Sequence, residues 1–347
     1  MALRVRLHLV GFGRVAKALV ELLESRPLSD SQGRAVRLEV IGIATGAHGC
    51  WAIPKGLDLG ELAQRSAGPE PLESWMPGER VRGTYELLRS VAGDVMVENS
   101  PLNPFGGEPA VSHVRQALRQ DLHVITANKG PAACAFRELR ALAEERGRAF
   151  LFESAVLGGT PVFRLVRAAL PGARLVGVRG LLNSTTSYLL ARIESGLSFA
   201  AALAEARQRG IAEADPEHDV EGLDAATKLA VLVNALLDGD VRPAEVERRG
   251  ISGLAVEDVR ESAAAGQPIR LVASAQRREG TLRCKVAPEA LSANDPLSGA
   301  GARGNALLLE TDVLGTIGIV QPEPGLERTA YGLYADLAEV VWRISRV

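Results

Sequence analysis

A glycine-rich turn near the N-terminus, placed between a strand pattern and a helix pattern, constrains the fold of this 347-residue chain most. Residues 5–10 alternate between apolar and polar and end in two apolar residues, as in a strand, and positions 15, 19, 22 and 23 are apolar at helical spacing. Between them stands Gly11-Phe12-Gly13-Arg14-Val15-Ala16, a GxGxxA motif. Gly11 permits a tight turn, Gly13 lets main-chain N–H groups approach a pyrophosphate, and Ala16 allows close packing of helix on strand. The chain is therefore predicted to begin with a Rossmann-type βαβ unit that binds a dinucleotide.

The end of the second predicted strand, residues 37–43, bears on the choice of dinucleotide. A site that selects NAD usually places Asp or Glu here, where it bonds the ribose 2′-hydroxyl. This chain has Ala44-Thr45-Gly46-Ala47-His48 instead. These residues leave room for a 2′-phosphate, so the sequence favours NADP, with NAD as the alternative. His48 is either a partner of that phosphate or an ordinary loop histidine.

Two further strand ends should face the same ligand, because open α/β sheets bind ligands beyond the carboxyl ends of their strands. Residues 94–98 form a strand pattern that ends in Asn99-Ser100-Pro101, and residues 123–126 form another that leads to Lys129. Only five of the 40 basic residues are lysines: Lys17, Lys55, Lys129, Lys228 and Lys285. In so arginine-rich a chain, a lysine beyond a strand end suggests a task that a guanidinium cannot perform, since only lysine has a pKa that surroundings lower easily. A solvated loop lysine is the simpler alternative.

Residues 210–237 combine an acidic half with an apolar helical half. The acidic half holds six carboxylates in twelve residues, namely Glu213, Asp215, Glu217, Asp219, Glu221 and Asp224. Glu221, Asp224 and Lys228 are spaced i, i+3 and i+7, which predicts one shared helix face. Such a set is either a surface ion pair or, because residues 229–237 are apolar nearly all round, a charged cluster directed into a cleft.

The predicted fold class is α/β, with two domains. Residues 1–153, completed by a helix at about 326–347, are expected to form the dinucleotide-binding domain, and residues 154–325 an α+β substrate-binding and dimerisation domain. The connecting segment 153–161 is rich in small residues, as expected where backbone passes close to a ligand or ion. In the second domain, Asn183-Ser184-Thr185-Thr186-Ser187 precedes a helix, and is either a carboxylate-binding helix start or a plain N-cap cluster.

Composition excludes several classes of partner. A net charge of −2 gives no reason to expect nucleic acid or an anionic membrane. No apolar run approaches the ~20 residues that span a bilayer, and the first residues lack the pattern of a signal peptide. Three cysteines at wide spacing match no metal motif and no even set of disulfides, so a reducing cytoplasm is the expected location.

At this point the chain resembles the homoserine dehydrogenase family over nearly its whole length. The segments that carry the resemblance are GFGRVAKAL at 11–19, VENSPLN at 97–103, HVITANKGP at 123–131, FESAVLGGTPV at 152–162, GLLNSTTSYLL at 180–190, GIAEADPEHDVEGLDAATK at 210–228 and RRGISGL at 248–254. The resemblance implies NAD(P)-dependent interconversion of L-homoserine and L-aspartate 4-semialdehyde in threonine, methionine and isoleucine biosynthesis. It also implies a small amino-acid substrate and a homodimer.

The same resemblance implies roles for individual residues. Lys228 and Lys129 would be the catalytic pair, drawn from the two domains, and Asp224 would orient Lys228. The substrate would be held by Glu213, Asp219, Asn183, Ser184 and Thr185, and the cofactor by Gly11, Phe12, Gly13, Arg14, Val15, Thr45, Asn99, Ser100, Pro101 and Lys129. Backbone carbonyls of Glu153, Val156, Gly158 and Thr160 would match the family's site for a monovalent cation such as Na⁺.

Two departures from the family pattern keep other functions open. Ser184 stands where the family usually has glycine, and Gln321-Pro322-Glu323-Pro324-Gly325 replaces a more glycine-rich loop. They motivate the alternative of a catalytically impaired regulator that binds a cofactor or an amino acid. A Rossmann oxidoreductase for another small aldehyde or alcohol is a second alternative. Because the chain stops at Val347 without the ligand-sensing domain of some members, feedback through such a domain is not expected.

Overall fold

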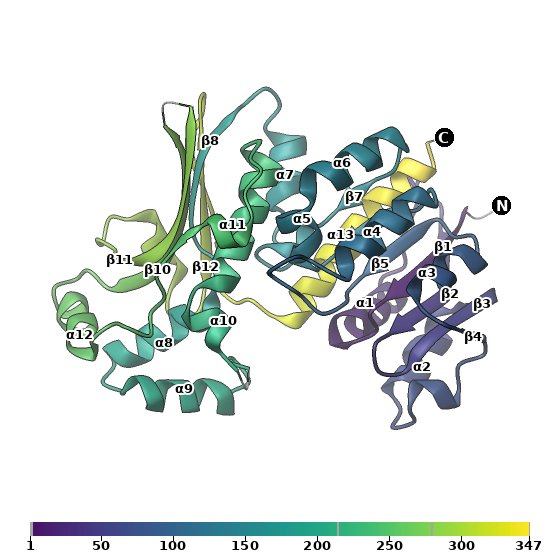
Figure 1. Ribbon diagram of the computed structural model, residues 1–347, viewed down its shortest axis with the longest axis horizontal. Coiled ribbons are helices and arrows are strands. Elements are labelled where there is room, and N and C mark those ends of the chain that lie inside the picture. Colours follow the sequence, from purple (N-terminus) through teal and green to yellow (C-terminus); the bar gives the residue numbers. More distant parts are fainter. Residues whose placement is uncertain (1–2, 214, 279, 347) are drawn as a thin grey trace. The chain divides into compact units, whose positions relative to one another are not determined.

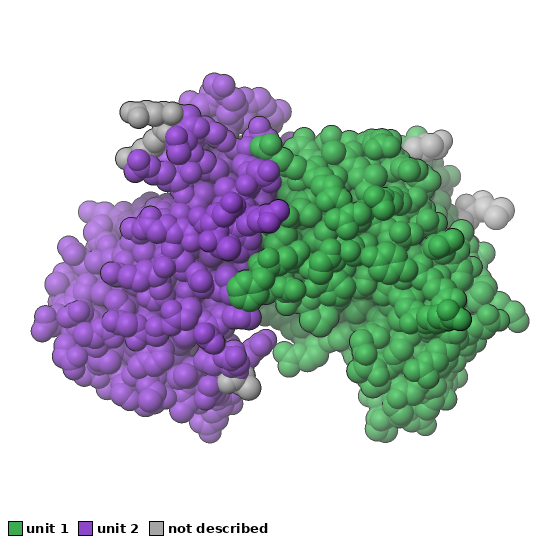
Figure 2. Space-filling view, viewed as in Figure 1, with its two compact units in different colours: residues 1–161, 325–347 green, residues 162–324 purple. Residues whose placement is uncertain are grey.

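The computed structural model of the protein describes residues 3–213, 215–278 and 280–346. The chain divides into two compact units (Figure 2). Unit 1 comprises residues 1–161 and 325–347, and unit 2 comprises residues 162–324. The C-terminal segment thus returns to the unit that contains the glycine-rich turn.

Unit 1 is built on a seven-stranded sheet with the order β4-β3-β2-β1-β5-β6-β7 (Figure 1). Its strands are β1 Leu3–Val10, β2 Val36–Thr45, β3 Gly49–Asp58, β4 Glu79–Val81, β5 Val95–Glu98, β6 His123–Thr126 and β7 Phe150–Leu151. Within this sheet, the neighbouring strands β2, β1, β5, β6 and β7 all run parallel. Their near-continuous apolar sequences, with β5 and β6 buried at every position, are those expected of strands covered on both faces.

Helices cover both faces of this sheet. The helices of unit 1 are α1 Arg14–Ser25, α2 Leu59–Ala67, α3 Thr84–Ser90, α4 Ala110–Arg119, α5 Lys129–Cys134, α6 Phe136–Glu145 and α13 Leu326–Ile344, with the short 3₁₀ helices η1 Leu72–Ser74 and η2 Glu153–Ala155. Apolar residues of α1, α2 and α13 share one core cluster with the sheet, and those of α3, α4 and α6 share another. This is a doubly wound α/β unit, and the predicted fold class is confirmed.

Helix α13, yellow in Figure 1, packs beside α1 in unit 1. Its residues Leu333, Leu337, Val340 and Val341 are fully buried. Their spacing of three and four residues forms one apolar stripe. The stripe explains why the end of the chain completes the first unit.

Residues 47–80 contain more structure than the sequence indicated. The region is rich in glycine and proline, yet β3 and β4 add two antiparallel strands to the edge of the sheet beyond β2. The alternation in β3 is interrupted by Pro54 and Gly56, which hides the strand from a pattern search. The chain therefore turns back directly after Thr45, at the ligand-binding edge.

Unit 2 is built on a six-stranded sheet with the order β13-β12-β8-β10-β11-β9. Its elements are α7 Val162–Ala169, β8 Leu175–Leu181, α8 Ser184–Glu194, α9 Phe199–Gln208, α10 Glu217–Val220, α11 Leu223–Leu236, η3 Pro243–Glu245, β9 Glu247–Arg248, α12 Val256–Ala264, β10 Ile269–Arg278, β11 Thr281–Ala290, η4 Pro296–Ala300, β12 Asn305–Thr311 and β13 Gly315–Gln321. Helices α8, α11 and α12 pack against β10. Helix α11, buried along most of its length, carries the acidic stretch at its start. In the part of the chain that the structure describes, no helix is long and apolar enough to cross a membrane.

Two histidines are buried in unit 1 in their neutral form. Nε2 of His8 lies 3.0 Å from the carbonyl oxygen of Val91, and Nδ1 of His123 accepts a hydrogen bond from the main-chain N–H of Ala149 at 2.9 Å. Burial lowers the pKa of each to about 4 from 6.5. An unfolded chain leaves both rings with ordinary pKa values, so the unfolded state binds more protons between these two values.

We predict that unit 1 loses stability as the pH falls from about 6.5 towards about 4. Each histidine should contribute up to about 1.4 kcal/mol per pH unit to this loss. The three tryptophans, Trp51, Trp75 and Trp342, all lie in unit 1, so urea unfolding followed by tryptophan fluorescence reports on this unit. His123→Asn should flatten the pH dependence, whereas His218→Asn, at an exposed position of unit 2, should not. Equal slopes in wild type and His123→Asn would contradict the assignment.

Candidate functional site

The glycine-rich turn of unit 1 has the close contacts that its sequence requires. Gly11 has a φ of +86°, and a Cβ at this position would lie 2.3 Å from the carbonyl oxygen of Asn99. The main-chain N–H of Gly11 donates to the carbonyl of Ala44 at 2.7 Å. Gly13 is the N-cap of α1, where no side chain caps the helix, and a Cβ on Gly13 would meet nothing within 4 Å. The start of α1 is therefore open to an anionic group.

The side chain of Asn99, directly beyond β5, indicates that a ligand belongs at this edge. Both Oδ1 and Nδ2 are shielded from solvent and have no hydrogen-bond partner among the described residues. Leaving a buried amide unpaired is costly. A ligand with one donor and one acceptor, such as the carboxamide of a nicotinamide, would satisfy both atoms. The residues here thus fit the predicted cofactor.

A buried carboxylate, Glu98, joins the two strand-end loops of unit 1. One of its oxygens accepts hydrogen bonds from the main-chain N–H of Ser100 at 2.9 Å and from the Ser100 hydroxyl. The other accepts from the Thr126 hydroxyl at 2.9 Å. Burial raises the pKa of Glu98, and the hydrogen bonds from Ser100 and Thr126 oppose that shift.

The amide of Asn128 completes this connection. Its Nδ2 donates to the carbonyl of Ser100 at 2.9 Å, and its Oδ1 accepts from the main-chain N–H of Gly130 at 2.9 Å. Asn128 is thereby the N-cap of α5, and Lys129 is the first residue of that helix. The alternative of a solvated loop lysine does not match this position, because the asparagine starts a helix directly after the strand. Lys129 is consequently fixed by a helix start and is not on a mobile loop.

The remaining residues predicted to bind the cofactor surround this edge. Phe12 and Val15 are half-buried, and Arg14 and Pro101 are exposed. The Thr45 hydroxyl accepts from the N–H of His48 at 2.8 Å and lies 3.3 Å from the carbonyl of Gly49. Thr45 therefore shapes the turn between β2 and β3.

In unit 2, Asn183 joins two carboxylates of the acidic stretch. Its Nδ2 donates to Asp219 at 2.6 Å and to Asp224 at 2.9 Å. Its Oδ1 accepts from the main-chain N–H of Thr186 at 2.8 Å, which makes Asn183 the N-cap of α8. One side chain therefore starts a helix and holds Asp219 and Asp224 side by side.

Lys228 is held from two sides beside this pair. Its Nζ donates to Asp224 at 2.8 Å and to the carbonyl of Leu182 at 2.6 Å. The side chains of Lys228 and Asp224 are only 18% and 16% exposed. An ammonium group has three N–H donors, and two of them have partners among the described residues. The ion pair is thus a positioned one and not a loose surface pair.

Two carboxylates, Asp219 and Asp224, lie beside Lys228 in this cluster. Burial, and then the charge of Asp224, raises the pKa of Asp219. A cationic group that entered here would relieve the repulsion between the two carboxylates. The cluster is therefore suited to bind an ammonium group next to a lysine that can exchange a proton.

The other predicted residues of unit 2 are placed differently. Glu221 does not share a helix face with Lys228, because Gly222, with φ +74°, separates α10 from α11. The Glu221 carboxylate instead accepts a hydrogen bond from the Ser252 hydroxyl. Glu213 is exposed. Thr185 is buried and its hydroxyl donates to the carbonyl of Ile211 at 3.2 Å, and Ser184 is the first residue of α8.

The segment predicted to hold a monovalent cation lies in unit 1. Leu157 and Gly158 both have positive φ, so successive carbonyls turn in different directions. The carbonyl of Gly158 also accepts from the N–H of Thr160 at 2.8 Å. Among the described residues there is no cluster of three His, Cys, Asp or Glu side chains that could hold a metal ion. Neutral carbonyl oxygens of this kind suit a singly charged cation better than a divalent one.

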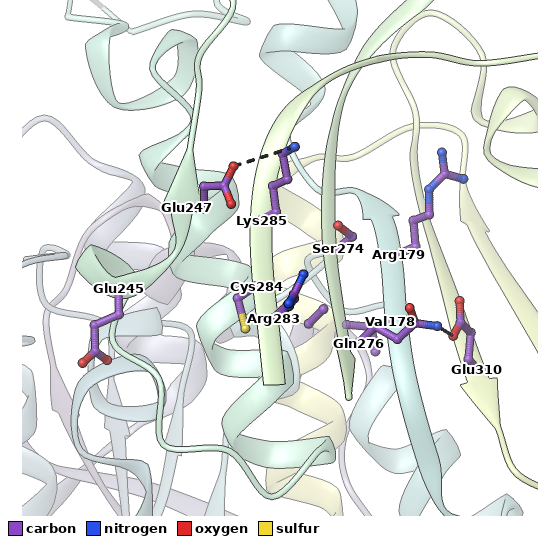
Figure 3. Close-up of a pocket in the computed structure, with 11 residues that line it drawn as sticks. Val178, Arg179, Glu245, Glu247, Ser274, Gln276, Arg283, Cys284, Lys285 and Glu310 are labelled. Atoms are coloured by element: carbon purple, nitrogen blue, oxygen red, sulfur yellow. Dashed lines mark hydrogen bonds and ion pairs between the residues drawn. The ribbon is translucent and has the colours of Figure 1, made fainter. Parts of the chain in front are cut away.

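A cavity of about 600 Å³ in unit 2 lies over the sheet (Figure 3). Some of its polar side chains have partners: Lys285 lies 3.8 Å from Glu247, and Gln276 donates to Glu310 at 3.2 Å. None of the predicted site residues lines it.

Sequence reasoning missed Glu98 and Asn128 as positioning residues. A signal was present for both. Glu98 is a charged residue at the end of an otherwise apolar strand, and Asn128 is a preferred N-cap residue ahead of Lys129. The sequence does not indicate that Glu98, at the end of β5, and Asn128, directly after β6, both form hydrogen bonds with Ser100.

Comparison with known proteins gives matches over both units. A family model described as homoserine dehydrogenase matches residues 161–338. A second, described as the NAD-binding domain of homoserine dehydrogenase, matches residues 11–153.

Individual relatives match along almost their whole length. The chain is 35% identical to an NAD(+)-dependent homoserine dehydrogenase of Pseudomonas canavaninivorans, with 96% of each chain covered. It is 31% identical to a homoserine dehydrogenase of Methanocaldococcus jannaschii, covering 96% of this chain and 97% of the relative. Among solved structures, a hyperthermophilic archaeal homoserine dehydrogenase in complex with NADPH superposes with a TM-score of 0.82 at 28% identity, covering 98% of both chains.

We predict that Glu98→Ala destabilises unit 1 by about 2 kcal/mol or more, because three donors lose their buried acceptor. It should also weaken nucleotide binding, since the loop with Asn99 and Ser100 is no longer tied to β6. Glu98→Gln keeps one carbonyl oxygen for Ser100 and should retain most of both properties. Urea unfolding by tryptophan fluorescence and titration with NAD or NADP measure the two effects. Nucleotide binding by Glu98→Ala at the wild-type level would contradict the positioning role.

Proposed function

Because the chain belongs to the homoserine dehydrogenase family, we propose that it interconverts L-homoserine and L-aspartate 4-semialdehyde with NAD(P) as the cofactor. The observation that carries the proposal is the cluster of Asp219, Asp224, Asn183 and Lys228, which has two carboxylates beside a held lysine. Homoserine has an ammonium group, which such a cluster can bind, and a hydroxyl group, which the lysine can deprotonate.

In this proposal Lys228 exchanges the proton of the reacting hydroxyl. When bound, the cofactor supplies the acceptor or donor of the hydride. Asp224 and the carbonyl of Leu182 fix Nζ of Lys228, so that its third N–H position is available to the substrate oxygen. In the oxidation, Lys228 in its neutral form takes the hydroxyl proton, and in the reduction it returns that proton to the aldehyde oxygen. Lys129, at the ligand-binding edge of unit 1, is proposed as the second catalytic lysine by family resemblance.

Substrate recognition follows from charge. Asp219 is proposed to accept the substrate ammonium, helped by Glu213. The start of α8, with Ser184 and Thr185, is proposed to bind the substrate carboxylate through main-chain N–H groups and hydroxyls. Asn183 fixes the start of α8 relative to Asp219 and Asp224, because it caps the helix and forms hydrogen bonds with both aspartates.

The cofactor is proposed to bind at the open start of α1, at the glycine-rich turn and at Asn99, whose unpaired amide suits a carboxamide. A monovalent cation such as Na⁺ is proposed at the carbonyls of Glu153, Val156, Gly158 and Thr160. A homodimer in the cytoplasm, with a role in amino-acid biosynthesis, completes the proposal. The three cysteines are free, which supports a reducing compartment.

We predict that Lys228→Ala lowers kcat by at least about 100-fold, because the proton transfer loses its general acid and base. The measurement is the homoserine-dependent formation of reduced cofactor. Lys285→Ala is the matched control, since Lys285 lies in the same unit in an exposed pair with Glu247 at 3.8 Å. Lys129→Ala should also lower kcat.

Wild-type kcat in Lys228→Ala would refute the assigned role. A wild-type protein that binds cofactor but does not turn over homoserine would favour the alternative of an impaired regulator. Turnover of a different small alcohol or aldehyde would favour another Rossmann oxidoreductase.

We further predict that Asp219→Asn raises KM for homoserine by about tenfold or more, since a charged hydrogen bond to the ammonium is lost. The change in kcat should be smaller, because this contact holds substrate and transition state alike. Asp215→Asn in the same acidic stretch is the control, because Asp215 is exposed and accepts from the N–H of Glu217 at 3.1 Å. An unchanged KM in Asp219→Asn would place the ammonium elsewhere.

A further inference from the structure

A second cavity, in unit 1, lies beside the glycine-rich turn. It has a volume of about 230 Å³ and is lined by Phe12, Lys17, His48 and residues of the segment 66–75. Phe12 belongs to the GxGxxA motif, and His48 lies in the turn directly after β2. In a dinucleotide-binding fold this is the place of the adenosine ribose. The cavity therefore lies where NAD and NADP differ, at the ribose 2′ position.

Glu73 lies in the segment 66–75 beside this cavity and contacts His48, which lines it. It belongs to η1, next to Leu72, which lines the cavity. Oε2 of Glu73 lies 2.8 Å from Nδ1 of His48. Both side chains are close to half exposed, so an ion pair here contributes little to stability. Its position suggests recognition instead.

The charge state of Glu73 suits such a role. Its own main-chain N–H, followed by the charge and hydrogen bond of His48, lowers the pKa of Glu73. The carboxylate is therefore ionised near neutral pH. It then accepts hydrogen bonds, neutralises a protonated His48 and repels a phosphate group.

We propose that Glu73 provides the carboxylate that the end of β2 lacks, and that it makes this chain select NAD over NADP. The inference rests on the proposed nicotinamide-dependent function. A ribose 2′-hydroxyl can donate to Glu73, as it does to the acidic residue at a strand end in NAD-selective sites. A 2′-phosphate would instead meet a carboxylate and find His48 already paired.

Charges of both signs surround the cavity. Glu70, which lines it, adds a second negative charge. Lys17, which also lines it, donates to the carbonyl of Ser66 at 2.9 Å. The guanidinium of Arg80 lies 5.8 Å from the centroid of the Trp51 ring, and its charge also acts on Glu73. Residues 44–48 alone favour NADP, and the proposal differs because it adds Glu73 of η1 to the site.

The test compares two nucleotide fragments that differ only at the ribose 2′ position, adenosine 5′-monophosphate and adenosine 2′,5′-bisphosphate. Dissociation constants are measured by calorimetry for wild type, Glu73→Gln and Glu144→Gln. Glu144→Gln is the matched control, because it makes the same charge change in an exposed pair with Arg140 on α6. Wild type and control should bind the monophosphate more tightly. Glu73→Gln should shift the ratio towards the bisphosphate by about tenfold or more.

A second variant identifies the cause. In Glu73→Gln/His48→Asn, the gain for the bisphosphate should shrink, because the released histidine can no longer pair with the phosphate. The inference is overturned if wild type prefers the bisphosphate, if Glu73→Gln leaves the ratio unchanged, or if neither fragment binds. Binding of fragments needs no turnover of homoserine. If the fragments bind in the predicted ratios but homoserine is not turned over, the proposed substrate is contradicted and the role of Glu73 stands. If homoserine is turned over but Glu73→Gln leaves the ratio unchanged, only the role of Glu73 is contradicted.

Discussion

The contact on which the candidate substrate site depends is the amide of Asn183 between Asp219 and Asp224. Two carboxylates in a partly buried region repel each other, and each loses solvation. The amide supplies two N–H donors, and Lys228 pairs with Asp224. An ammonium group beside Asp219 would relieve the remaining repulsion between the carboxylates. The same asparagine caps α8, so the charged pair and the helix start that faces it cannot move independently.

A comparable arrangement organises the ligand-binding edge of unit 1, with neutral donors in place of a cation. Glu98 collects hydrogen bonds from Ser100 and Thr126, and Asn128 returns one to the carbonyl of Ser100. Two adjacent loops are thereby tied together at the ends of β5 and β6. Short polar side chains achieve this at low entropic cost, and they fix Lys129 at a helix start. Both units thus place a lysine by means of an asparagine N-cap.

The sequence predicted those elements whose signals are local. The strand–GxGxxA–helix unit, the strand at 123–126 and the buried helix with Lys228 all follow from patterns within about 20 residues. Predictions failed where one residue changed the path. Gly222 enters a left-handed conformation and removes Glu221 from the face of Lys228, and Pro54 and Gly56 disguise β3. A helical periodicity carries no information about a single residue with positive φ, so the shared face of Glu221, Asp224 and Lys228 could not be tested from spacing alone.

The sequence by itself determined the fold class, because the fold class depends on periodicity and on the spacing of motifs along the chain. Its motifs indicated the family by resemblance, and they supplied the candidate charged residues of the site. The tertiary structure decided which of six carboxylates act together and which residue meets His48. Asp219 is brought to Asp224 by an amide 36 residues earlier in the chain, and Glu73 is brought to His48 across 25 residues. Side-chain charges interact through space, whereas the sequence records only the order of residues, so contacts of this kind appear only when the chain has folded.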